Sequence, residues 1–101
     1  MENKKWFVYM LECSDSTIYT GITNDLERRI KVHNSGKGSK YVKTRLPVKL
    51  VWNTESENRS EASKLEIKIK KLSRVQKINI IENKKEVSDL FKSYSIISPI
   101  L

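Results

Sequence analysis

Residues 6–23 read WFVYMLECSDSTIYTGIT, and this stretch decides how the chain folds. Trp6–Cys13 and Ile18–Thr23 are dense in aromatic and branched apolar side chains, which is typical of buried strands. The polar run Ser14–Thr17 separates them, and its Ser and Asp side chains can hydrogen-bond their own backbone. The stretch therefore predicts two antiparallel strands joined by a hairpin turn.

The next segment predicts a helix, a loop and a third strand. Asn24 stands three positions before Glu27, the spacing of a capping box, and predicts a helix that ends near His33. Residues 34–47 contain glycines, a proline and basic side chains, so we expect a surface loop without core residues. Val48–Asn53 then predicts the third strand.

The second half of the chain predicts helices. Apolar residues recur at helical spacing from about Ser60, and a second helix capped by Ser73 would turn three apolar residues inward. The first set is Ala62, Leu65, Ile69 and Leu72, and the second is Val75, Ile78 and Ile81. The fold class is α/β (α+β), a small three-stranded, mostly antiparallel sheet flanked by helices in the order β-β-α-β-α-α. We expect one domain over residues 1–83 and a helical extension, 84–101, packed on it.

The composition limits the chemistry. With 101 residues, 38% hydrophobic and 32% charged, the chain suits a single core. The only cysteine, Cys13, excludes an internal disulfide and zinc sites built from cysteine pairs, and His33 is the only histidine. Because no apolar run approaches the roughly 20 residues that cross a bilayer, we expect no membrane partner and a cytoplasmic protein.

The positive charge is concentrated in one region. The formal net charge is +8, and Arg28–Lys49 holds eight basic residues and no acidic one. Such a block favours a polyanion such as DNA, while a solubilising lysine-rich surface is the alternative. The candidate nucleic-acid-binding residues are Arg28, Lys37, Lys40, Tyr41, Lys43 and Arg45.

Four residues around the second strand could form a reactive site. Arg29 and His33 are four positions apart, so they share one face of the predicted helix. The tight passage of the chain through Gly21 would allow this face to lie beside Tyr19. A guanidinium, an imidazole titrating near neutral pH and a phenol can together bind a phosphate and move a proton. Taken singly, each side chain also has an ordinary role, as a helix charge, a helix-end cation or a strand aromatic.

Glu66 is the only acidic residue between Ala62 and Ile81. One interpretation is an intrahelical ion pair with Lys70, four positions later. The other is a ligand of one Mg²⁺ ion, since that ion accepts a single protein carboxylate when water and phosphate complete its shell.

In order and spacing, several short motifs resemble a GIY-YIG nuclease domain, closest to the small stand-alone members, over roughly Lys5–Ile81. They are Phe7-Val8-Tyr9, Tyr19-Thr20-Gly21, residues 25–29 with His33-Asn34, residues 36–41 and residues 47–51. The resemblance implies a metal-dependent endonuclease that acts on DNA, directed by the structure of its substrate, with RNA left open and a protein partner for targeting. A non-catalytic nucleic-acid-binding module is the alternative, and an interaction module using Ile96–Leu101 is a third.

The resemblance also implies roles for single residues. Tyr9, Tyr19, Arg29 and His33 would be catalytic, Gly21 structural, and Glu66 the ligand of one Mg²⁺ or Mn²⁺ ion. Tyr9 and Tyr19 must then share a sheet face, yet a four-residue loop at Ser14–Thr17 would place them on opposite faces. We therefore predict a hairpin register shifted by one residue, or a bulge.

Overall fold

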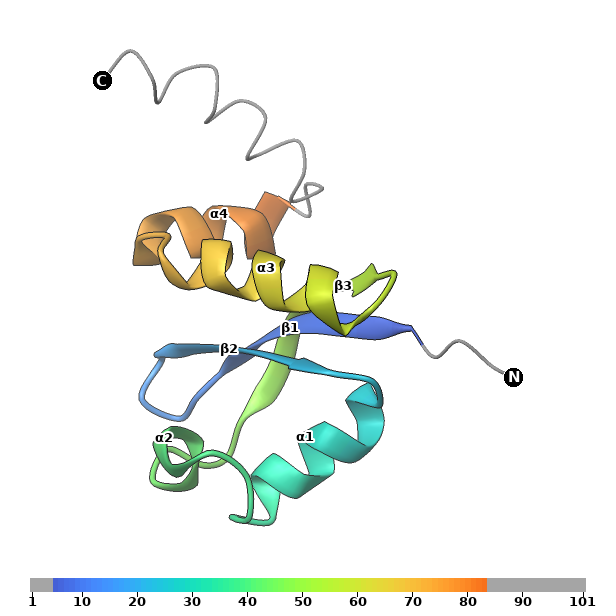
Figure 1. The fold of residues 1–101 in the computed structure, drawn as a ribbon. Helices are drawn as coiled ribbons and strands as arrows, with labels where there is room; N and C mark the ends of the chain where they lie inside the picture. Colours follow the sequence, from blue (N-terminus) through green and yellow to red (C-terminus); the bar gives the residue numbers. More distant parts are fainter. Residues whose placement is uncertain (1–4, 84–101) are drawn as a thin grey trace.

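The computed structural model describes residues 5–83, which form one sheet with helices on both faces (Figure 1). The elements are β1 (Trp6–Glu12), β2 (Ile18–Thr23), α1 (Leu26–Asn34), α2 (Lys40–Lys43), β3 (Lys49–Ser56), α3 (Arg59–Lys70) and α4 (Arg74–Asn83). The strand order is β2-β1-β3, and both pairings are antiparallel. The predicted fold class is therefore confirmed. The extension 84–101 and the interaction module at Ile96–Leu101 lie outside the described residues.

The two faces of β1 supply two separate apolar clusters, because successive strand residues point to opposite sides. On the face covered by α3 and α4, the buried members are Val8, Met10, Ala62, Ile69 and Ile80. On the face covered by α1 and α2, they are Tyr9, Leu11, Cys13, Val42 and Val48. No helix within residues 5–83 is long and apolar enough to cross a membrane.

The β1–β2 turn sets the strand register. The backbone N–H of Cys13 donates to the carbonyl of Thr17 at 2.9 Å, so the loop has three residues instead of the expected four. Ser16 makes this possible by adopting a left-handed backbone with φ of 69°. Tyr9 consequently lies opposite Gly21, two residues beyond Tyr19. The predicted shift of one residue is confirmed, and both tyrosines share a face.

Three local expectations are wrong. Asp25, not Asn24, caps α1, because its carboxylate accepts from the backbone N–H of Arg28 at 3.2 Å. The third strand extends to Ser56 because it pairs with β1 as far as Trp6. The expected loop contains the short helix α2, and Val42 within it is completely buried.

The helices on the other face follow the sequence more closely. Asn58 caps α3, and Ser73 caps α4 as predicted, with its hydroxyl accepting from the N–H of Gln76 at 3.1 Å. The inward position predicted for Val75 is wrong, since this residue is 70% exposed. Helix α4 packs through its second half instead, where Ile80 is buried in the core.

Candidate active site

Tyr9 lies across Gly21, its partner on the edge strand β2. A Cβ atom at position 21 would stand only 2.6 Å from the Tyr9 hydroxyl oxygen and 2.7 Å from its Cζ. Only glycine leaves room for the phenol at this point. The missing side chain of Gly21 therefore lets the Tyr9 hydroxyl reach over β2 towards α1, and the structural role of Gly21 at a reactive site stays a prediction.

The Tyr9 hydroxyl contacts His33, which lies on α1. The Tyr9 hydroxyl oxygen and Nε2 of His33 are 2.9 Å apart, and this hydrogen bond is buried. The His33 ring is completely buried and packs against the backbone of Gly38, where any side chain would collide with it. Among residues 5–83, Nδ1 of His33 has no hydrogen-bond partner. The imidazole is thus fixed in orientation with Nε2 directed at the phenol.

The rings of Tyr9, Tyr19 and His33 form the centre of the site, called here the tyrosine cluster. The ring centroids of Tyr19 and His33 are 5.4 Å apart, and those of Tyr9 and Tyr19 are 6.4 Å apart. Tyr41 stacks on Tyr19 from α2, with a centroid distance of 6.0 Å and an interplanar angle of 25°. The two predicted catalytic tyrosines and the predicted histidine are therefore brought together.

The charges of Arg29 and Glu66 both act on the Tyr9 phenol. Burial raises the pKa of Tyr9 above its ordinary value, and hydrogen bonding by the Arg29 side chain opposes the rise. The neighbouring Tyr19 raises the pKa further, the positive charge of Arg29 lowers it, and the negative charge of Glu66 raises it. The pKa of Tyr9 thus responds to charges on two helices, Arg29 on α1 and, most weakly, Glu66 on α3.

His33 is neutral at physiological pH. Burial, followed by the positive charge of Arg29, lowers its pKa from 6.5 to about 4. The expectation that this imidazole titrates near neutral pH is therefore wrong, because it neglected burial beneath Gly38. A neutral imidazole can still accept the phenolic proton at Nε2.

Glu66 offers a single carboxylate to this site. Its side chain is only 20% exposed, and its Oε2 lies 3.2 Å from Nζ of Lys70. The ion pair considered as the alternative is therefore formed. Within the described part of the chain, no three His, Cys, Asp or Glu side chains cluster as a metal site. The donor set fits an ion that takes one carboxylate and completes its shell with water and substrate phosphate, as Mg²⁺ does.

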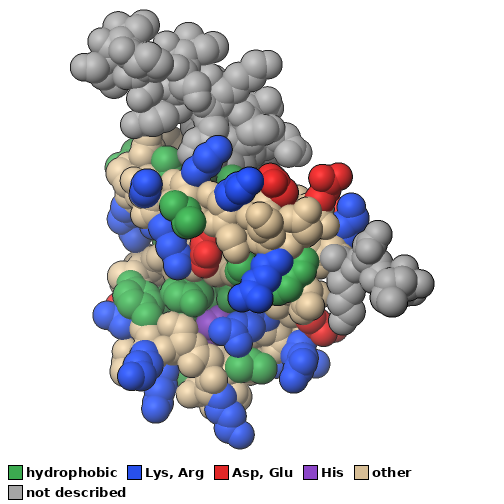
Figure 2. Space-filling view, in the orientation of Figure 1, with side chains coloured by type: hydrophobic (Ala, Val, Ile, Leu, Met, Phe, Trp, Pro, Cys, Tyr) green, Lys and Arg blue, Asp and Glu red, His purple; other side chains and the backbone are tan. Residues whose placement is uncertain are grey.

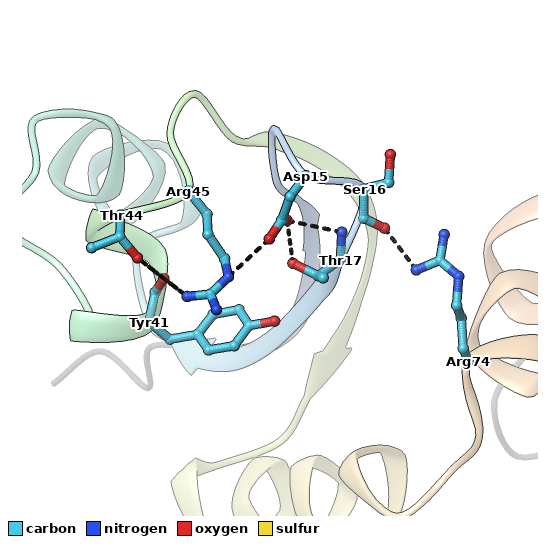
Figure 3. A network of polar contacts seen from close by, with 7 residues as sticks. All are labelled: Asp15, Ser16, Thr17, Tyr41, Thr44, Arg45 and Arg74. Atoms are coloured by element: carbon cyan, nitrogen blue, oxygen red, sulfur yellow. Dashed lines mark hydrogen bonds and ion pairs between the residues drawn. The ribbon is translucent and has the colours of Figure 1, made fainter.

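Arg45 is engaged within the protein (Figure 3). Its Nε donates to Asp15 at 3.0 Å, and one of its terminal nitrogens donates to the carbonyl of Tyr41 at 2.8 Å. The guanidinium carbon also lies 3.9 Å from the centroid of the Tyr41 ring. These contacts tie α2 to the β1–β2 turn, so Arg45 and Tyr41 support the position of Tyr19. Their assignment to nucleic-acid binding stays a prediction.

The other predicted nucleic-acid-binding residues are exposed: Arg28, Lys37, Lys40 and Lys43. Figure 2 shows many Lys and Arg side chains on the face in view, over both helical layers, and few acidic ones. Arg28 and Arg29 also line a polar cavity of about 330 Å³ at the start of α1. These side chains are therefore accessible to a polyanion, and their role in nucleic-acid binding stays a prediction.

Sequence reasoning missed two supporting residues. The sequence indicates Gly38 only as part of a basic surface loop and of the 36–41 motif, although it makes room for the His33 ring. Asp15 was read only as a turn residue, although it pairs with Arg45. The Gly36-Lys37-Gly38 spacing was a signal for the first, but nothing near Asp15 in sequence indicates its partner 30 residues away.

The fold is that of a small catalytic domain. The sequence pattern of the GIY-YIG catalytic domain matches residues 5–79, and the chain belongs to this family. The chain is similar to the UPF0213 protein YsiG of Lactococcus lactis subsp. lactis (strain IL1403), with 51% identity over 80 residues that cover 78% of this chain and 77% of the relative. It is also 48% identical, over 80 residues, to UPF0213 protein SH2523 of Staphylococcus haemolyticus (strain JCSC1435), covering 79% of this chain and 98% of that protein.

Two solution NMR structures have the same fold. The UPF0213 protein BH0048 from Bacillus halodurans aligns with a TM-score of 0.52 and 44% identity, covering 79% of this chain and 85% of that one. The protein EF2693 from E. faecalis aligns with a TM-score of 0.55 and 44% identity, covering 82% and 90%. The resemblance inferred from the motifs, including that to small stand-alone members, is therefore confirmed.

Proposed function

We propose that this protein is an endonuclease that hydrolyses phosphodiester bonds in DNA with one divalent metal ion. One observation supports the proposal above all others. The buried Tyr9 hydroxyl is hydrogen-bonded to His33 and is acted on by the charges of Arg29 and Glu66. A proton-transfer group, a permanent cation and a carboxylate thus all influence one phenol, and phosphodiester hydrolysis uses groups of these three kinds.

In this proposal, each side chain has a distinct task. Arg29 stabilises the negative charge that develops on the phosphoryl oxygens. Tyr19 accepts a proton from the attacking water as its own phenolic proton passes to the Tyr9 hydroxyl, which in turn passes its proton to Nε2 of His33. The new P–O bond forms as the bond to the leaving oxygen breaks, and the leaving oxygen takes its proton from solvent water. Because burial keeps His33 neutral, Nε2 is available as an acceptor without prior loss of a proton.

Glu66 would hold the metal ion, Mg²⁺ or Mn²⁺, and Lys70 would be displaced from its carboxylate when the ion binds. The bound ion would neutralise charge on a phosphate oxygen. The half-buried position of the carboxylate supports this role, since burial strengthens its attraction for a cation.

The substrate we propose is DNA recognised by its structure, such as a nick, flap or branch of the kind processed in DNA repair. The exposed cations of α1 and the 37–43 segment suit backbone phosphates, which carry no sequence information. RNA has the same phosphates and is tested beside DNA. The proposal includes a cytoplasmic location and a protein partner that directs the enzyme to its substrate.

The decisive experiment compares cleavage of branched and single-stranded DNA in Mg²⁺ and in EDTA. We expect cleavage only with the metal, and a loss of at least about 100-fold in Arg29→Ala and Glu66→Ala. Lys64→Gln, on the same helix as Glu66, is the matched control and should cleave normally. Cleavage that survives both alanine substitutions would refute the assigned site.

A non-catalytic nucleic-acid-binding module, or a subunit that needs a partner to be active, is the second candidate. The ion pair between Glu66 and Lys70 favours it, because this contact occupies the only carboxylate assigned to the metal. Wild-type protein that binds DNA but never cleaves it would support this candidate. Wild-type cleavage that depends on Glu66 would exclude it.

A further inference from the structure

A second basic site lies on the other side of β2 from the 37–43 segment. A cavity of about 220 Å³ between the β1–β2 turn and α4 is lined by Thr17, Ile18, Arg74 and Lys77. A terminal nitrogen of Arg74 donates to the carbonyl of Ser16 at 2.7 Å (Figure 3). This bond joins residues 58 positions apart and fixes the guanidinium at the mouth of the cavity.

The cations at this cavity are crowded. Burial lowers the pKa of Lys77, and the positive charge of Lys70 lowers it further. Among residues 5–83, Arg74 and Lys77 form no ion pair with a carboxylate, whereas Lys70 is paired with Glu66. The ammonium groups of Lys70 and Lys77 repel each other, and an anion bound beside Lys77 would relieve the repulsion.

The cavity and the candidate active site lie on opposite faces of the edge strand β2. Ile18 directly precedes Tyr19 on β2, and Lys70 follows Glu66 by one helical turn. The tyrosine cluster therefore lies between the exposed cations near α1 and α2 and the cations of α3 and α4. A chain of phosphates that crosses the tyrosine cluster would reach basic side chains on both sides.

We propose that the cavity bordered by Arg74 and Lys77 is a subsite for a backbone phosphate of the nucleic acid, next to the bond that is cleaved. The inference rests on the proposed nucleic-acid substrate and extends it to a residue pair outside the reactive centre. Within the described residues, only one of the five donors of the Arg74 guanidinium is used, by Ser16. The remaining donors and the Lys77 ammonium can converge on phosphate oxygens, for which a guanidinium fork is well suited.

The test measures DNA binding by the full chain over a series of salt concentrations, by fluorescence anisotropy in EDTA so that no cleavage occurs. Each phosphate contact contributes about 0.7 to 0.9 to the slope of log affinity against log salt concentration. We expect Lys77→Gln to reduce the slope by this amount and Lys77→Arg to retain it. Thermal unfolding of each variant checks that the fold is kept.

Lys64→Gln is the matched control, because Lys64 lies about 200° around α3 from Glu66 and is paired with Glu61 at 3.5 Å. Its slope should equal that of the wild type. An unchanged slope in Lys77→Gln, or equal reductions in both glutamine variants, would overturn the subsite while leaving the nuclease proposal intact. Wild-type protein that binds neither DNA nor RNA would instead overturn the proposed function itself.

Discussion

The hydroxyl oxygen of Tyr9 lies 2.9 Å from Nε2 of His33, although 24 residues separate the two in the chain. The contact joins the central strand β1 to α1 and passes over Gly21, the residue whose missing side chain makes it possible. The candidate active site is therefore built into the packing between sheet and helix.

The energy of this contact can be measured with a double-mutant cycle of Tyr9→Phe and His33→Phe. We expect Tyr9→Phe to lower the free energy of unfolding by roughly 1 kcal/mol, because it removes a buried hydrogen bond. Urea denaturation of both single variants and the double variant gives the coupling between the residues, expected above about 0.5 kcal/mol. Strictly additive losses would show that the two side chains do not interact.

Gly36 and Gly38 should respond differently to alanine. Gly38→Ala places a methyl group against the His33 ring, so we expect a loss of about 1 to 3 kcal/mol. Gly36→Ala is the comparison, since its Cβ would make only an ordinary contact, 4.0 Å from Cδ1 of Leu46, and its φ of +83° disfavours alanine by about 1 to 2 kcal/mol. NMR titration should show a rise in the pKa of His33 in the first variant only. A His33 pKa that is the same in both variants would contradict the packing role of Gly38.

Stability should fall with acidification through the titration of His33. Because the folded-state pKa of about 4 lies below the unfolded value of 6.5, the unfolded chain binds the proton first. His33 therefore stabilises the fold fully above pH 6.5, and this contribution declines as the pH falls towards 4, by roughly 3 kcal/mol in total. Chemical denaturation from pH 7 to 4 measures the decline. The control is His33→Tyr, whose pH dependence should be shallower, and identical curves would contradict the prediction.

Asp15 should control the position of α2. Asp15→Asn weakens the contact with Arg45, which also lies over the Tyr41 ring that stacks on Tyr19. We expect faster amide hydrogen exchange in α2 and changed ring chemical shifts for Tyr41 and Tyr19. Glu12→Gln is the comparison, since it breaks an exposed ion pair with Lys49 elsewhere on the surface. If both variants leave exchange in α2 unchanged, Asp15 does not anchor this helix.

The sequence allowed much of the fold to be predicted because the relevant signals are local. Runs of aromatic and branched apolar residues located β1 and β2, helical spacing located α3, and the Ser73 cap located the start of α4. The errors lie where distant packing prevails over local pattern. Val42 is buried in a segment that is polar overall, because Tyr9 and Leu11 supply an apolar surface for it.

The types of residue at the site could also be predicted, but their protonation and their contacts within the protein could not. The motifs pointed to Tyr9, Tyr19, Arg29, His33 and Glu66. The structure groups the rings of Tyr9, Tyr19 and His33, and the charges of Arg29 and Glu66 shift the pKa of Tyr9. The burial that keeps His33 neutral depends on Gly38, and Arg45 is held within the protein by its hydrogen bond to Asp15. Both effects arise from contacts that no spacing along the chain reveals.

The sequence by itself thus determined the order of the strands and of the three longer helices, the basic character of the surface and the family, since these follow from composition and from residues close together in the chain. The tertiary structure alone decided the hairpin register, the charge state of His33 and which arginines are engaged inside the protein. These properties depend on desolvation and on distances between segments far apart in sequence, which exist only once the chain is packed.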